Sequence, residues 1–154
     1  MSQKTALSLV SNDSSPNNLF NPKIPEGSYR LAYEHSETAK MYNHGKLVLH
    51  FKVIDFGEAF STPLQRFYNV DYISGKPKKS GSFKATKGGD LLLEYLTLFP
   101  AATPKRLDRI NMEIFKGQII IGKVKTVKNN NRQRQLPEQM QYSVIERLVR
   151  VSNE

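Results

Sequence analysis

Five basic side chains occur between residues 117 and 135, and no acidic residue lies among them. A second acid-free segment, residues 76–87, holds five lysines. The two segments carry all of the basic excess of the 154-residue chain, whose net charge is +9. Lysine and arginine neutralise phosphates and release counterions, so charge concentrated in this way predicts a polyanion-binding surface. We select as phosphate ligands Lys123, Lys125, Lys128, Arg132 and Arg134, with Lys84 and Lys87 from the second segment.

Aromatic side chains next to these cations are the second requirement for binding single strands, because each stacked base contributes about 1–3 kcal/mol. Phe83 lies among lysines, and Tyr42 lies in a predicted polar loop, so we expect both to face solvent. Phe67 and Tyr68 are consecutive in a predicted strand, which means that only one of them faces solvent. We expect Tyr68 on the exposed face together with Arg66. Each cation alone would also fit an ordinary solvated surface.

The sequence offers little for catalysis or metal binding. It contains no cysteine, which excludes disulfides, thiolate metal ligands and a cysteine nucleophile. The three histidines, His35, His44 and His50, show no metal-ligand spacing. No glycine-rich segment is followed by the Gly-Lys-Ser/Thr that cradles phosphates. We therefore expect no cofactor, no metal and no enzymatic activity. The alternative is a metal-dependent nuclease built on the carboxylates of Glu34, Glu37, Asp55 and Glu58.

Alternating apolar residues predict a mainly β domain that has to position these side chains. Residues 46–56 give the clearest strand: Leu47, Leu49, Phe51 and Val53 form a core face. Lys46 and Lys52 lie on the same strand and are further candidate phosphate ligands. Gly122 suggests a bulge or bend in the strand at 118–128. The other predicted elements are strands at 29–33 and 64–72, a helix from Asp90 to Pro100, and a last strand from 142 that closes the sheet or runs into a helix. Predicted loops cover 35–45, 74–89 and 128–137, and residues 101–117 are irregular.

The length predicts one domain, residues 24–154, preceded by a flexible arm, residues 1–23, rich in Ser and Asn. The mean hydropathy is −0.51, and no apolar run reaches the length of a membrane span. No secretory h-region is present in the first residues, so we expect a cytoplasmic protein. Neither basic segment has an amphipathic helical pattern, which argues against a membrane partner.

Three strands, one helix and two further strands follow one another in the order of an OB-fold, a five-stranded Greek-key barrel. From residue 24 to 149 the chain also resembles uncharacterised proteins of bacterial mobile elements and phages that are similar to OB-fold single-stranded-DNA-binding proteins. The resemblance rests on Ile24-Pro-Glu-Gly-Ser-Tyr29, residues 46–56, Arg66-Phe-Tyr-Asn-Val70 and Tyr142-Ser-Val-Ile145.

This resemblance implies binding of single-stranded DNA with little sequence preference, in replication, recombination or transfer of a mobile element. RNA binding and a protein-interaction domain stay open as alternatives, because the distinction between DNA and RNA depends on whether a 2′-hydroxyl is accepted. An oligomer is also compatible with the sequence. The expected arrangement places the binding surface on the second and third strands and on the loops at 35–45 and 128–137.

Overall fold

A computed structural model describes residues 21–153, so most of the predicted N-terminal arm lies outside the described residues. The chain divides into two compact units. The larger, here called the sheet unit, comprises the described residues 25–125 and 144–153. The smaller, here called the hairpin unit, includes the described residues 21–24 together with residues 126–143. None of the helices among the described residues is long and apolar enough to cross a membrane.

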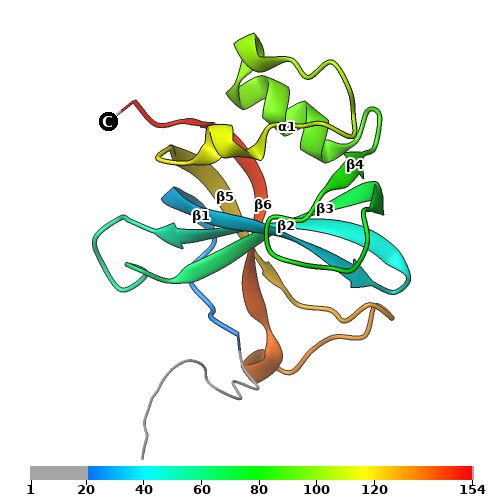
Figure 1. Ribbon diagram of the computed structural model, residues 1–154. Coiled ribbons are helices and arrows are strands. Elements are labelled where there is room, and N and C mark those ends of the chain that lie inside the picture. Colours follow the sequence, from blue (N-terminus) through cyan, green and yellow to red (C-terminus); the bar gives the residue numbers. More distant parts are fainter. Residues whose placement is uncertain (1–20, 154) are drawn as a thin grey trace, which may run out of the picture. The chain divides into compact units, whose positions relative to one another are not determined.

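A six-stranded sheet is the main feature of the fold (Figure 1). Its strand order is β4-β3-β2-β1-β5-β6, and β1 pairs antiparallel with both β2 and β5. The mainly β prediction is confirmed, with one α-helix between the third and fourth predicted strands. The structure adds one short strand, β4. The strands are β1 (Gly27–Met41), β2 (His44–Val53), β3 (Pro63–Ile73), β4 (Phe83–Ala85), β5 (Ile119–Val127) and β6 (Tyr142–Val151).

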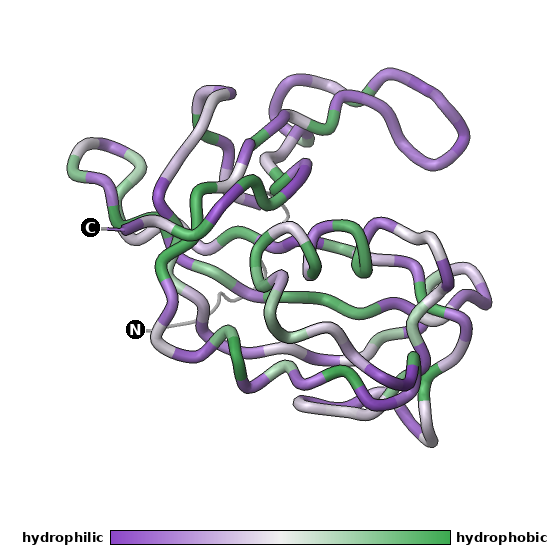
Figure 2. Tube along the Cα trace, turned by 90° about the horizontal axis from the view of Figure 1, so that it is seen from above, coloured by the Kyte–Doolittle hydropathy of each residue, from purple (hydrophilic) through white to green (hydrophobic). Residues whose placement is uncertain are grey.

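The core lies on one side of this sheet. The predicted core face of β2 is confirmed, since Leu47, Leu49, Phe51 and Val53 are all buried. Their neighbours in β2 are more exposed, apart from Val48, because successive side chains of a strand point to opposite sides. Figure 2 shows hydrophobic stretches of the chain separated by hydrophilic ones.

β1 is much longer than predicted, and the expected loop at 35–45 is wrong. The strand continues to Met41, and a two-residue turn formed by Tyr42 and Asn43 leads directly into β2. Both turn residues have positive φ angles, 52° and 65°, as a type I′ hairpin turn requires. The polar stretch at 35–45 was mistaken for a loop because its strand buries Ser36 and Thr38 instead of large apolar side chains.

Part of the predicted loop at 74–89 covers the second half of β1. The Thr38 N–H donates to the carbonyl of Lys78 at 2.9 Å, and the Ser80 N–H donates to the carbonyl of Ser36 at 2.9 Å. The buried Thr38 hydroxyl also accepts from the Lys78 N–H at 3.1 Å. These bonds satisfy an edge of β1 that β5 does not reach, since the pairing with β5 ends at Ala32.

The helix α1 (Asp90–Leu98) packs through Leu91, Tyr95 and Leu98, and Pro100 follows it as predicted. Gly89 is its N-cap. Its inward-facing Glu94 accepts from the Tyr68 hydroxyl at 2.6 Å and from the Leu148 N–H at 2.9 Å, and it forms a salt bridge with Arg66. One carboxylate thus joins α1 to β3 and β6. Three short 3₁₀ helices complete the structure: η1 (Pro100–Ala102), η2 (Met112–Phe115) and η3 (Glu138–Met140).

β5 confirms the predicted strand, but Gly122 is not a bulge in its pairing with β1, which is regular there. A Cβ at Gly122 would lie 2.5 Å from Cδ1 of Leu31, so the absence of a side chain makes room for a core leucine. β6 remains a strand to Val151, and the alternative of a terminal helix is wrong.

In the hairpin unit, residues 128–136 form a compact turn. The Leu136 N–H donates to the Lys128 carbonyl at 2.7 Å, and the Asn130 N–H donates to the Arg134 carbonyl at 2.9 Å. Ser143 connects this turn region to residues 21–24 of the same unit, because its hydroxyl accepts from the Ile24 N–H at 2.8 Å.

Candidate nucleic-acid interface

The side of the sheet away from the core is half-exposed. β2 and β3 meet there in the register Lys46–Asn69, Val48–Phe67 and His50–Gln65, and β1 adds His35 opposite His50. β5 contributes alternate residues whose neighbours Ile120, Gly122 and Val124 are buried. We call this side the outer face and define it by His35, Glu37, Lys46, His50, Lys52, Phe67, Lys123 and Lys125.

Three predicted binding residues are buried. Arg66, Tyr68 and Phe83 are only 8%, 2% and 6% exposed, so the expectation that they face solvent is wrong. Tyr68 and Arg66 point to the core side of β3, where both contact Glu94. Phe83 begins β4 and pairs with Ile73, which explains its burial inside a polar segment. Next to Arg66 and Tyr68 in β3, the partly exposed aromatic side chain is therefore Phe67.

A β-bulge in β1 decides which side chains reach the outer face. Tyr33 pairs with Phe51 and His35 with His50, so Glu34 is an extra residue between two regular pairs. In a strand without a bulge, His35 would point to the same side as Tyr33, because residues two apart share a side. Tyr33 packs edge-on against Phe51 at 5.6 Å between ring centroids. The bulge reverses the alternation and turns His35 and Glu37 to the side of His50.

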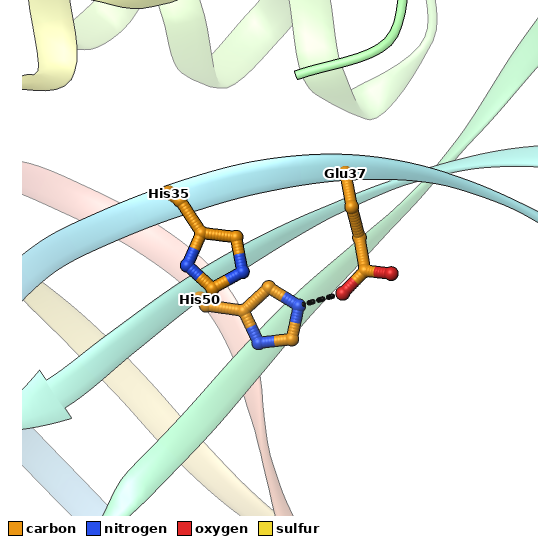
Figure 3. A group of neighbouring side chains, drawn as sticks. All are labelled: His35, Glu37 and His50. Atoms are coloured by element: carbon orange, nitrogen blue, oxygen red, sulfur yellow. Dashed lines mark hydrogen bonds and ion pairs between the residues drawn. The ribbon is translucent and has the colours of Figure 1, made fainter. Parts of the chain in front are cut away.

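His35, Glu37 and His50 form a cluster on the outer face (Figure 3). The two imidazole rings are stacked, with centroids 4.4 Å apart and planes inclined by 14°. Nε2 of His50 forms a short contact with a carboxylate oxygen of Glu37. Partial burial, followed by the nearby His50 and Lys79, lowers the pKa of His35. The sequence analysis did not predict this cluster. The pattern His-Xaa-Glu with a histidine on the next strand indicates a cluster only when the position of the bulge is known.

The predicted lysines differ in their surroundings. Lys46 donates to the side chain of Asn69, Lys52 lies 3.4 Å from Glu34, and Lys84 lies 4.0 Å from Asp71. Within residues 21–153, by contrast, no acidic group forms an ion pair with the exposed Lys87, Lys123 or Lys125. The positive charges of Lys87, Lys123 and Lys125 are therefore not neutralised by an ion pair.

The hairpin unit exposes the remaining predicted cations, Lys128, Arg132 and Arg134. The carboxamide oxygen of Asn130 accepts from the N–H groups of Arg132 and Arg134, both at 2.9 Å. This arrangement fixes the backbone of the turn and leaves the arginine side chains in solvent. No ion pair involves these three side chains in the part of the chain that the structure describes.

Two exposed phenylalanines were not singled out from the sequence. Phe56 and Phe60 lie in the connection between β2 and β3, and they are 92% and 52% exposed. Their rings stack with centroids 5.8 Å apart and planes inclined by 11°. The predicted Tyr42 is exposed as well, at the tip of the β1–β2 turn. Exposed aromatic rings of this kind are available for contact with a flat apolar group.

A polar cavity of about 430 Å³ lies beside the bulge of β1. His35 and Lys79 line it together with Asp108, Glu113 and Lys116. Its charges have both signs, so it does not select an anion or a cation.

No protein-family model matches the chain, and neither the curated proteins nor the solved structures searched give a match.

Proposed function

We propose that the protein binds single-stranded nucleic acid, in the first place DNA, with little sequence preference. The observation that carries the proposal is a set of exposed cations that have no acidic partner among residues 21–153. In a chain of net charge +9, these side chains are free to neutralise phosphates. The predicted phosphate ligands in this set are Lys87, Lys123 and Lys125 in the sheet unit, and Lys128, Arg132 and Arg134 in the hairpin unit.

Aromatic surface in the sheet unit favours a single strand over a duplex. Phe67 and the stacked imidazoles of His35 and His50 belong to the outer face, and Phe56 and Phe60 expose a second stack. Flat rings next to cations are the usual means of binding unpaired bases without sequence readout. A duplex keeps its bases stacked on one another and would use only the charge.

The sheet order supports an OB-like architecture for this function. Leaving out the short β4, the order β3-β2-β1-β5-β6 is the one obtained by opening a five-stranded OB barrel between its third and fifth strands. Glu94 of α1 bonds to β3 and to β6, the two strands at that opening. OB-folds bind oligonucleotides on their second and third strands, which here contribute Lys46, Lys52 and Phe67 to the outer face. A role in replication, recombination or transfer of a mobile element rests on the sequence resemblance.

Fluorescence anisotropy with a labelled single-stranded DNA of about thirty nucleotides tests the proposal, since that length covers more than one OB-sized site. We expect binding that a duplex of equal length competes for only weakly. Two paired variants, K123A/K125A and R132A/R134A, should each weaken binding. The control K105A/R109A removes the same charge from exposed residues outside these surfaces and should have a smaller effect.

The variant F56A/F60A separates stacking from charge. These side chains are exposed, so their loss should leave the fold intact while it weakens single-strand binding and leaves duplex binding unchanged. Equal affinity for duplex and single strand would reduce the activity to general polyanion attraction. No binding at low salt would overturn the proposal. Competition with RNA of the same length distinguishes the two nucleic acids, and Mg²⁺-dependent loss of the labelled strand would indicate a nuclease.

A further inference from the structure

We propose that His35, Glu37 and His50 form a binding site for one divalent transition-metal ion, with Zn²⁺ as the natural probe. The inference does not depend on nucleic-acid binding. It extends beyond the sequence, which showed no metal-ligand spacing among the histidines.

Distance is the first argument. One potential ligand atom from each of the three residues lies within 4.8 Å of the other two. At metal–ligand distances of about 2.0–2.2 Å, tetrahedral ligands stand roughly 3.3 Å apart. Coordination of one ion by both imidazoles requires rotation of the stacked rings, because their nitrogen lone pairs lie in ring planes that are inclined by only 14°. Nε2 of His50 and the carboxylate of Glu37 already face each other, and a metal ion would take the place of the proton between them.

Strand alternation, cross-strand pairing and one β-bulge bring the three ligands together. Glu37 follows His35 by two residues on the same strand, and His50 lies directly opposite His35 on β2. The bulge at Glu34 places all three on the same side of the sheet. Since neighbouring strands are about 4.8 Å apart, the cross-strand pair keeps the two imidazoles close enough for rotation of the rings to bring one nitrogen of each toward the same ion.

The ligand types indicate which ion fits. Two imidazoles and one carboxylate suit Zn²⁺ and similar transition metals, whereas Ca²⁺ and Mg²⁺ prefer oxygen ligands. Three protein ligands leave at least one coordination position for water or another small ligand. Partial exposure of Glu37 and His50 gives an ion access from solvent. Two further charges face the cluster: Glu34 favours a cation, and Lys79 opposes it.

A purely structural role is the competing explanation. The His50–Glu37 contact and the stacked rings form a self-contained cross-strand interaction that needs no ion. The two explanations differ in what happens on addition of metal, because only a site with convergent ligands binds with a defined stoichiometry.

The test is titration of the untagged full chain with Zn²⁺ against a chromophoric chelator, without nucleic acid. We expect one ion per chain and a rise of Tm with Zn²⁺ concentration, since a ligand that binds only the native state stabilises it. Binding of Co²⁺ should give the intense visible absorption of a low-coordinate site. The variants H35Q, H50Q and E37Q should each bind Zn²⁺ at least about tenfold more weakly. Even substitution of a residue that only hydrogen-bonds to a metal ligand lowers the metal affinity by about that factor.

His44 supplies the matched control. It is the third histidine, lies on β2 and is exposed, and H44Q should bind Zn²⁺ like the unchanged protein. Circular dichroism of each variant establishes whether it is folded. If a histidine variant is not folded, the comparison of Zn²⁺ affinities uses E37Q. Absence of stoichiometric Zn²⁺ binding, or binding unaffected by both H50Q and E37Q, would overturn the proposal. Failure of DNA binding has no bearing on this result.

Discussion

At the scale of single residues, Glu94 has the most demanding environment. Its carboxylate accepts from the Tyr68 hydroxyl, the Leu148 N–H and the Arg66 guanidinium, and the guanidinium lies 4.3 Å above the Tyr68 ring. Burial, and next the charge of Glu94, holds the pKa of Tyr68 well above its ordinary value. The charged pair is almost covered, so neither partner can return to water when the other is removed.

We predict that E94A destabilises the protein by about 3–5 kcal/mol, the usual result of leaving one charge of a buried pair without its partner. E94Q should cost less, because the amide still accepts hydrogen bonds. Denaturant unfolding measures both, and E146A, a substitution at an exposed position of β6, should change stability by no more than about 0.5 kcal/mol. A loss below about 1 kcal/mol for E94A would show that Glu94 does not hold α1 to the sheet.

At the scale of elements, the close contact of β1 and β5 depends on a missing side chain. Tyr29 of β1 lies opposite Gly122, and the Leu31 side chain fills the space where a Cβ would be. The glycine therefore reflects packing and not backbone conformation, since its φ is not positive.

G122A should destabilise the protein by about 1–3 kcal/mol through overpacking. Because the contact is the end of the Leu31 side chain, shortening that side chain should relieve it. In a double-mutant cycle, G122A/L31V should therefore cost less than the sum of the two single variants. Additive costs would mean that the new methyl group meets something other than Leu31.

How much the sequence revealed differs between elements for physical reasons. The strand faces at 46–56 and 118–128 and the helix at 90–98 were predictable, because apolar periodicity marks them directly. The second half of β1 was not, since it buries Ser36 and Thr38 against another backbone segment. The prediction that Tyr68, and not Phe67, faces solvent is wrong. It took the charged Arg66 as a mark of the exposed side, but Arg66 is buried together with Glu94.

The candidate site shows the same limits. The exposure of Lys123, Lys125 and the cations of the turn at 128–136 was predictable, because their own segment contains no acidic residue. The ion pairs of Lys52 and Lys84 join residues from different strands or loops, which no local pattern reveals. The histidine cluster required the bulge, whose single extra residue cannot be located from alternation alone.

At the scale of the whole molecule, the basic excess is divided between the two units. Lys123 and Lys125 end the first of the two segments that form the sheet unit, and Lys128, Arg132 and Arg134 follow within the hairpin unit. Each unit has its own exposed cations, so each should contribute separately to the salt dependence of binding.

We predict that the plot of log K against log salt concentration for single-stranded DNA becomes less steep by about 1.4 in K123A/K125A, since each lost phosphate contact removes about 0.7. R132A/R134A should have the same effect. K105A/R109A should leave the slope unchanged. Parallel plots for all variants, with weaker binding throughout, would mean that these cations act on the protein and not on phosphates.

The two-residue turn at Tyr42 and Asn43 has a consequence for how a polymer would reach the outer face. A long connection between β1 and β2 could arch over a bound strand, which would then have to be threaded from a free end. A connection of two residues is too short to form such an arch. At this end of the outer face, a circular strand or an internal segment of a long strand would bind from the side as readily as a strand terminus.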